Sequence, residues 1–140
     1  MLNFQATTSG TYRETTQEIT VSVEPQYLSQ QSNPGQGQYV WAYHVRIENG
    51  GSQTVQLMSR HWRITDARGQ TQEIVGDGVV GKQPVLNPGD HFDYTSGTPL
   101  STPSGFMAGT YHMETLEGAR FDIAVPTFSL DSPHVSTPLH

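Results

Sequence analysis

Apolar and polar residues alternate with a period of two through much of the chain from Ile19 onward, the pattern of strands that bury one face. Ile19, Val21 and Val23 share one face, and the aromatic-rich segment 39–47 repeats the pattern. No segment of useful length has the spacing of an amphipathic helix. Residues 18–130 contain about seven short strands separated by turns. The pattern predicts an all-β fold, an antiparallel immunoglobulin- or fibronectin type III-like β-sandwich, with a small closed barrel as the alternative.

Glycine-containing turns predict how three pairs of strands align. A three-residue loop at 116–118, with Gly118 in the left-handed conformation, separates apolar pairs from charged pairs on the two faces of one hairpin. The apolar pairs are Met113 with Phe121 and Tyr111 with Ile123, and the charged pairs are Glu114 with Arg120 and His112 with Asp122. Similar hairpins at 67–69 and 49–51 would pair Trp62 with Ile74, Arg63 with Glu73, Val45 with Val55 and Tyr43 with Leu57. In a sandwich, the alternative for such a tight connection is a crossing between the two sheets. The predicted core includes Trp41, Tyr43, Trp62, Tyr111, Phe121 and Ile123.

The length of 140 residues predicts one domain with one core. We expect a single β-sandwich domain over residues 1–131, with a flexible arm or an edge strand before about residue 18. Residues 132–140 contain two prolines and few apolar side chains. We expect them to form a flexible C-terminal tail.

The charge balance is acidic, with 13 Asp and Glu residues against 7 Lys and Arg residues and a formal net charge of −6. Such a surface repels phosphate backbones, so we expect no nucleic-acid partner. The absence of cysteine excludes disulfides, thiolate zinc sites and cysteine nucleophiles. No apolar run approaches the roughly 20 residues that span a bilayer, and the N-terminus lacks a signal-peptide pattern. We therefore expect no membrane insertion and a cytoplasmic location.

Gly76, Gly78 and Gly81 have the spacing of a dinucleotide-binding loop, which needs a helix directly after it. Two prolines follow too soon for that helix, so a dinucleotide-binding fold is rejected. We expect the glycines to serve a bulged turn that requires positive φ. The alternative is an anion nest, in which exposed backbone amides and Lys82 bind phosphate or pyrophosphate.

Arg60 and His61 form a candidate partner-binding pair, since they would grip an anionic group beside Trp62. Strand alternation directs Trp62 inward and His61 outward, so a purely structural histidine is the favoured alternative. His91 and Asp93 have the two-residue spacing that can chelate a metal, but two ligands predict at most weak binding of a divalent ion. No nucleophile-elbow serine and no His-Glu-x-x-His sequence occurs, so we expect neither an enzyme nor a resident cofactor.

Several sequence motifs occur in an order that is specific to one protein family. They lie in residues 43–49, 55–66, 76–84, 88–90, 94–97, 105–111 and 121–130. Together they resemble the bacterial ApaG family over residues 18–130, and the visible departures are the N-terminal arm and the tail after residue 130. The resemblance implies a fibronectin-type β-sandwich, in agreement with the strand count.

The same resemblance implies an association with cobalt resistance and magnesium efflux. A chain without a membrane-spanning segment cannot itself be the efflux pore. Related domains in eukaryotic F-box proteins and in a polymerase-delta-interacting protein imply a role in protein binding. We therefore expect a non-catalytic interaction module whose partner is another protein. An anion- or nucleotide-binding protein is the second hypothesis, and a protein that senses metal directly is the third.

Overall fold

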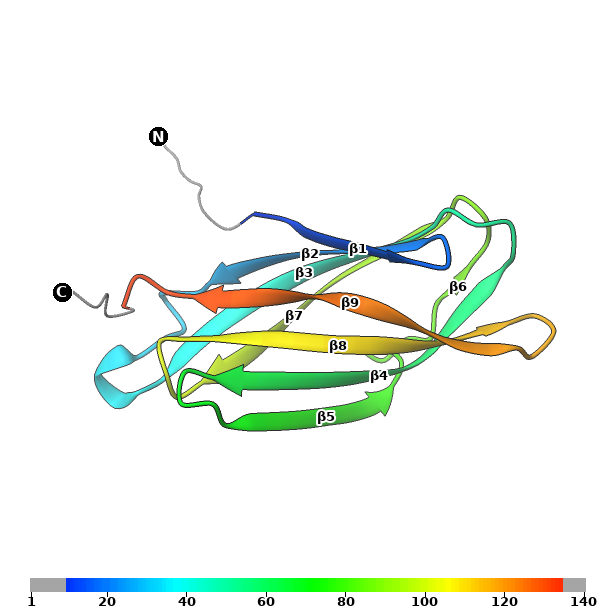
Figure 1. Ribbon diagram of the computed structural model, residues 1–140. Coiled ribbons are helices and arrows are strands. Elements are labelled where there is room, and N and C mark those ends of the chain that lie inside the picture. The colour runs from blue at the N-terminus through cyan, green and yellow to red at the C-terminus, as the bar shows by residue number, and fades with distance from the viewer. Residues whose placement is uncertain (1–9, 135–140) are drawn as a thin grey trace, which may run out of the picture.

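Two antiparallel sheets pack face to face in the computed structural model, which describes residues 10–134 (Figure 1). The first sheet has the order β1-β2-β3-β7, with β1 (Tyr12–Thr16), β2 (Ile19–Tyr27), β3 (Tyr39–Asn49) and β7 (His91–Leu100). The second has the order β5-β4-β8-β9, with β5 (Thr71–Asp77), β4 (Val55–Asp66), β8 (Ser104–Thr115) and β9 (Arg120–Asp131), and β6 (Val85–Leu86) pairs with β4. A 3₁₀ turn, η1 (Pro34–Gln36), lies between β2 and β3. The predicted all-β sandwich is confirmed.

The described chain has nine strands, because β1 and the two-residue β6 add to the seven that the alternation predicts. β1 is the edge strand of the first sheet. Of the two alternatives predicted before residue 18, a flexible arm or an edge strand, the edge strand is therefore the one that forms over residues 12–16. Residues 1–9 and 135–140 lie outside the described part of the chain. Residues 132–134, which the sequence assigned to the tail, contact the sandwich. The Ser132 hydroxyl donates to the Pro103 carbonyl at 2.7 Å, and the His134 ring packs 5.9 Å from the Tyr27 ring.

The inward-facing side chains of both sheets form a continuous hydrophobic core. Alternate side chains of β3 are buried, whereas His44 and Arg46 between them are exposed, as the period-two pattern requires. Five of the six residues predicted for the core are buried, namely Trp41, Tyr43, Trp62, Tyr111 and Ile123. The sixth, Phe121, is partly buried against the same core. Among residues 10–134, no helix is long and apolar enough to cross a membrane.

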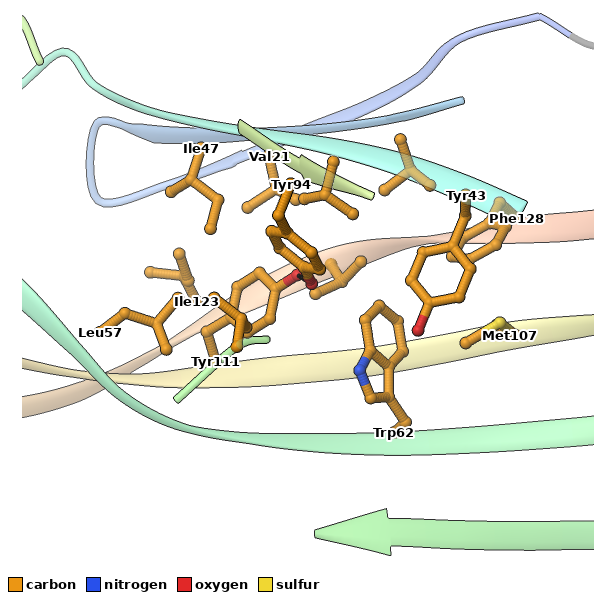
Figure 2. Close-up of a cluster of buried hydrophobic side chains, with 14 of the residues drawn as sticks. Val21, Tyr43, Ile47, Leu57, Trp62, Tyr94, Met107, Tyr111, Ile123 and Phe128 are labelled. Atoms are coloured by element: carbon orange, nitrogen blue, oxygen red, sulfur yellow. Dashed lines mark hydrogen bonds between the residues drawn. The ribbon is translucent and has the colours of Figure 1, made fainter. Parts of the chain in front are cut away.

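A hydrogen bond between two tyrosine hydroxyls joins the sheets inside this core (Figure 2). Tyr94 comes from β7 of the first sheet and Tyr111 from β8 of the second, and their oxygens lie 2.5 Å apart. Burial is the largest effect on both phenols and raises the pKa of each. Each hydroxyl is therefore neutral at pH 7, and the bond satisfies two polar atoms that have no access to water.

Two of the three predicted hairpins form in the predicted register. Gly118 has φ 90° and Gly69 has φ 84°, the left-handed conformation that each three-residue loop requires. The β8–β9 hairpin and the β4–β5 hairpin pair every residue as predicted: Met113 with Phe121, Tyr111 with Ile123, Glu114 with Arg120, His112 with Asp122, Trp62 with Ile74, and Arg63 with Glu73.

The third predicted hairpin, at 49–51, is wrong. β3 lies in the first sheet and β4 in the second, so the expected pairs Val45–Val55 and Tyr43–Leu57 do not form. The buried Asn49 side chain donates to the carbonyls of Gln53 and Leu86, at 2.8 and 3.0 Å, and so holds the chain as it crosses between the sheets. Residues on both strands face one shared core, so the hydrophobic pattern is the same for a crossing as for a hairpin.

The two sheets meet along one side, where β1 lies beside β9 (Figure 1). The Tyr12 ring packs 6.2 Å from the Phe128 ring, and the Ala124 amide donates to the Thr16 hydroxyl at 3.2 Å. On the other side, β5 and β7 end their sheets, and the segment between them carries β6 and the glycine motif.

Candidate functional site

The glycine motif forms a tight reversal of the chain, which we name the glycine turn (residues 78–82). The Val79 amide donates to the Lys82 carbonyl at 2.8 Å, and the Lys82 amide donates back to the Val79 carbonyl at 2.9 Å. Val80 and Gly81 between them have φ 44° and 79°. Two successive positive φ values with this bond pair define a type I′ turn. The turn leads the chain from the end of β5 toward β6.

Gly76 and Gly78 allow close approaches of the backbone at this turn. Gly78 has φ 61°, and its amide donates to the Met58 carbonyl at 2.9 Å. A Cβ at Gly78 would lie 2.2 Å from the Lys82 carbonyl oxygen, and one at Gly76 would lie 2.9 Å from Arg60 Nη1. Positive φ at Gly78 and Gly81 confirms the expectation for two of the three glycines, whereas Gly76 has no positive φ and instead leaves room for the Arg60 side chain. Phosphate binding at this turn stays an untested alternative.

Arg60, on the inner face of β4, hydrogen-bonds to the chain at the start of the glycine turn. Its Nη1 donates to the Asp77 carbonyl at 3.0 Å and to the Gly78 carbonyl at 2.9 Å. The structure thus joins Arg60 to the predicted glycine site. His61 points to the outer face, where its Nε2 lies 3.3 Å from Glu73 Oε1. Arg60 and His61 therefore do not act as one pair, because adjacent residues of a strand face opposite sides.

His91 and Asp93 lie on the outer face of the first sheet, beside two further basic side chains. His91 Nε2 is 3.6 Å from Asp93 Oδ2, but Arg46 donates to both oxygens of Asp93, from Nε at 2.9 Å and from Nη2 at 3.3 Å. This hydrogen-bonded guanidinium holds the pKa of Asp93 below its usual value. The carboxylate is thus engaged by a cation of the chain itself. Within residues 10–134, no cluster of three or more His, Asp or Glu side chains is arranged to hold a metal ion.

A groove of about 490 Å³ crosses β4 and β8 on the outer face of the second sheet, beside the glycine turn. A β-bulge between Leu57 and Ser59 interrupts the strand there and places Met58 in the groove lining. Phe121, which is partly buried, adds further apolar surface, whereas Met113 beneath it is 1% exposed and belongs to the core. The hydrophobic alternation contains no signal for this bulge, so the sequence did not predict the groove.

Charged and polar side chains complete the groove in one row across four strands. The register aligns Asp77 of β5, Ser59 of β4, His112 of β8 and Asp122 of β9. His112 Nδ1 lies 2.5 Å from Asp122 Oδ1. The predicted β8–β9 register had already placed His112 and Asp122 on one exposed face. It could not show that Asp77 and Ser59 continue the row.

A second hollow, of about 610 Å³, lies over the outer face of the first sheet. Its lining is polar throughout and includes Arg13, Glu24 and Arg46. The groove beside the glycine turn differs because it combines apolar and charged surface. This combination makes the groove the stronger candidate for a binding site.

The fold and these surfaces place the chain among small antiparallel β-sandwich domains with a groove on one sheet. Comparison with known proteins then gives the family. The family model described as ApaG domain matches residues 29–115. The chain belongs to the ApaG family, as its sequence motifs predicted.

Named relatives are similar over most of the chain. Protein ApaG of Paramagnetospirillum magneticum is 64% identical over 123 residues, which cover 88% of this chain and 95% of the relative. Protein ApaG of Rhodospirillum centenum is 62% identical with the same coverage. A crystal structure of a Bordetella pertussis protein designated ApaA is 52% identical, with a TM-score of 0.80, covering 84% of this chain and 95% of that one.

Proposed function

We propose that this ApaG-family domain is a non-catalytic binding module, that its partner is another protein, and that the partner binds in the groove over β4 and β8. The observation that carries the proposal is the composition of the groove. Met58 and Phe121, both partly exposed, supply apolar surface, and polar and charged side chains line most of the rest. Protein interfaces combine an apolar centre with a polar rim, and flexible methionine side chains adapt to the shape of a partner.

The charges of the groove favour a basic partner. Asp77, Glu114 and Asp122 contribute carboxylates. Arg120 is the guanidinium in the lining, and its Nε already donates to Glu114 at 3.3 Å. The net charge of −6 acts in the same direction over the whole surface. A basic side chain of the partner would therefore be attracted to this face.

The family resemblance to proteins associated with cobalt resistance and magnesium efflux fits a role through a protein. A domain that binds a transporter or its regulator can change ion flux without holding the ion. The proposal assigns no enzymatic step and no resident cofactor to the chain, and it keeps the expected cytoplasmic location.

Site-specific photo-crosslinking in living cells tests the proposed surface. A photoreactive amino acid replaces Gln83, which lines the groove, and in a control chain it replaces Gln26, which is exposed on the first sheet. We expect a protein adduct from position 83 and none from position 26. Asp122→Lys, a change at an exposed position, should abolish that adduct by reversing the charge. Equal adducts from both positions, or an adduct insensitive to Asp122→Lys, would contradict the proposed groove.

Anion binding at the glycine turn is the second candidate function. Within the described residues, the amides of Val80 and Gly81 donate to no backbone carbonyl, and the Lys82 side chain is exposed beside them. Calorimetric titration with pyrophosphate and with ATP tests this function at low and high salt. Saturable binding that weakens with salt and is lost in Lys82→Ala would favour it over protein binding. Titration with Mg²⁺ and Co²⁺ in the same series tests the metal-sensing hypothesis.

A further inference from the structure

β5 ends the second sheet with an edge that no other strand of the described chain covers (Figure 1). It pairs with β4 along its length from Thr71 to Asp77 and packs chiefly against that strand. Its seven residues include neither proline nor lysine, the two residues that most often protect an exposed edge. β1 and β9, by contrast, cover each other where the sheets meet. β5 is therefore open to pairing with an added strand.

The hydrogen bonds at both ends of β5 show which backbone groups face the open edge. The Gln70 carbonyl accepts from the Asp66 amide, and the Gly78 amide donates to the Met58 carbonyl, so even-numbered residues face β4. Odd-numbered residues therefore direct both backbone groups outward, because neighbours along a strand alternate. Thr71, Glu73 and Val75 offer an amide and a carbonyl each. At Asp77, Arg60 already holds the carbonyl and closes that end of the edge.

The equivalent edge of the first sheet is protected by its sequence. The Asp90 carbonyl accepts from the Asn49 amide, so even-numbered residues of β7 face β3 and odd-numbered ones face outward. Pro99 occupies one of these outward positions and has no amide hydrogen to donate. An added strand is disfavoured there, whereas β5 has no such interruption.

We propose that β5 is a docking site for an extended segment of a basic protein, which adds to the second sheet as a further strand. Glu73 and Asp77 flank Val75 on the outer face of β5, and Ile74 between them is partly buried against the core. A segment with a basic residue opposite each carboxylate, and a β-branched residue between, would complement this pattern. This surface meets the groove over β4 and β8 at Asp77, which lines both, but the open backbone positions Thr71, Glu73 and Val75 lie outside the groove lining, so the two proposals can fail separately.

A second copy of the chain fits this edge poorly. Hydrogen bonding would pair odd-numbered residues of one β5 with odd-numbered residues of the other. In the central antiparallel registers, Glu73 then lies opposite or diagonal to Glu73 or Asp77 of the second copy. Like charges at such positions are destabilising. The acidic edge therefore selects a basic segment of another protein.

A synthetic peptide tests the proposal, with the sequence Thr-Lys-Thr-Val-Ile-Lys-Thr and both ends blocked. Backbone NMR of the full chain should show saturable shifts at Thr71, Glu73 and Val75 and slower hydrogen exchange of their amides. A peptide with glutamate in place of lysine should not bind. Shifts at the groove instead of β5, or equal binding of the glutamate peptide, would overturn the proposal.

Variants of β5 separate backbone pairing from side-chain contact. Val75→Pro removes one outward amide without disturbing the bonds to β4, and should weaken peptide binding by about tenfold or more. Val75→Thr keeps the amide and should bind like the natural chain. Glu73→Gln provides a charge test that does not depend on how the proline variant folds, and it should weaken binding several-fold. Unchanged binding by Val75→Pro or by Glu73→Gln would refute the proposal.

Two further controls identify the occupant. Asp122→Lys alters the groove and should leave peptide binding at β5 unchanged. In sedimentation of the chain alone, we expect no dimer that forms through β5, that is, no dimer that is present in the natural chain and lost in Val75→Pro. Such a dimer would make a second copy the occupant and would overturn the basic partner.

Discussion

Single residues with unusual backbone conformations shape the glycine turn. Val80 is β-branched and has φ 44°, a conformation that such residues rarely adopt. The two bonds between Val79 and Lys82 hold it there. Gly78 also has positive φ, and in addition the nearby Lys82 carbonyl leaves no room for a Cβ at this position. Positive φ and available space are thus separate constraints on two glycines of one motif.

Alanine substitutions at Gly78 and Gly81 test this separation. Gly78→Ala should lower the free energy of unfolding by about 2 kcal/mol or more, since a Cβ 2.2 Å from the Lys82 oxygen adds a clash to the left-handed strain. Gly81→Ala, at φ 79° with nothing within 4 Å, should cost only about 1 kcal/mol. Urea unfolding followed by fluorescence measures both. Equal losses would show that space does not distinguish the two positions.

Arg60 shows the limit of sequence reasoning at this scale. Alternation correctly separates it from His61, since it predicts Trp62 inside and His61 outside. The alternation of apolar and polar residues does not indicate which groups the end of a long, flexible side chain contacts. Arg60 reaches the Asp77 and Gly78 carbonyls because the β4–β5 register places Gly76 directly opposite it. The absence of a side chain at Gly76 leaves room for the guanidinium.

At the scale of elements, β3 and β7 are linked on their outer faces by the Arg46–Asp93 pair. The register places the two residues opposite each other, and the guanidinium lowers the carboxyl pKa. A carboxyl with a lowered folded-state pKa stabilises the fold above its unfolded value of about 3.9. That contribution disappears as the pH falls through the folded-state pKa.

Removing the guanidinium should raise the Asp93 pKa toward its ordinary value. The variant is Arg46→Gln, and the measurement is an NMR titration of the Asp93 side-chain carboxyl between about pH 2 and pH 6. Arg13→Gln is a matched control, because Arg13 donates to Ser22 on the same face without contacting Asp93. An unchanged Asp93 pKa in Arg46→Gln would show that another group causes the shift.

Strands and hairpins were predictable where the local sequence alone determines them. Gly69 and Gly118 define two hairpins, since each loop needs a left-handed residue and one register separates apolar from charged pairs. The local sequence could not decide between a hairpin and a crossing at 49–51, because the crossing depends on a bond from Asn49 to Leu86, far along the chain. The groove was missed for a related reason. The bulge between Leu57 and Ser59 shifts the register of β4 against β8, and the alternation of apolar and polar residues contains no signal for it.

At the scale of the whole molecule, the two sheets are joined by the core and by the Tyr94–Tyr111 bond within it (Figure 2). Burial raises the pKa of Tyr94 and Tyr111 above the ordinary value of about 10. Above that pH, the unfolded chain releases protons that the folded chain retains. The free energy of unfolding should therefore fall as the pH rises above about 10.

Phenylalanine variants test this alkaline sensitivity. In urea unfolding, the free energy of unfolding of the double variant Tyr94→Phe with Tyr111→Phe should fall less steeply between about pH 9 and about pH 11.5 than that of the natural chain. Tyr111→Phe alone leaves the Tyr94 hydroxyl without its partner and should cost about 1 to 3 kcal/mol at pH 7. Restoring part of that loss with the second substitution would confirm the coupling. An identical alkaline slope in the double variant would contradict it.

The contact between β1 and β9 has a consequence for biosynthesis. β9 leaves the ribosome after the other eight strands of the described chain, yet it covers the edge of the first strand and supplies Ile123, Phe128 and Leu130 to the core. A nascent chain that ends before Arg120 therefore exposes apolar surface on β8 and an open edge on β1. Such partly synthesised chains are prone to associate with one another or with chaperones. Closure of the sandwich must wait for the translation of β9, so folding of this domain is completed late rather than strand by strand.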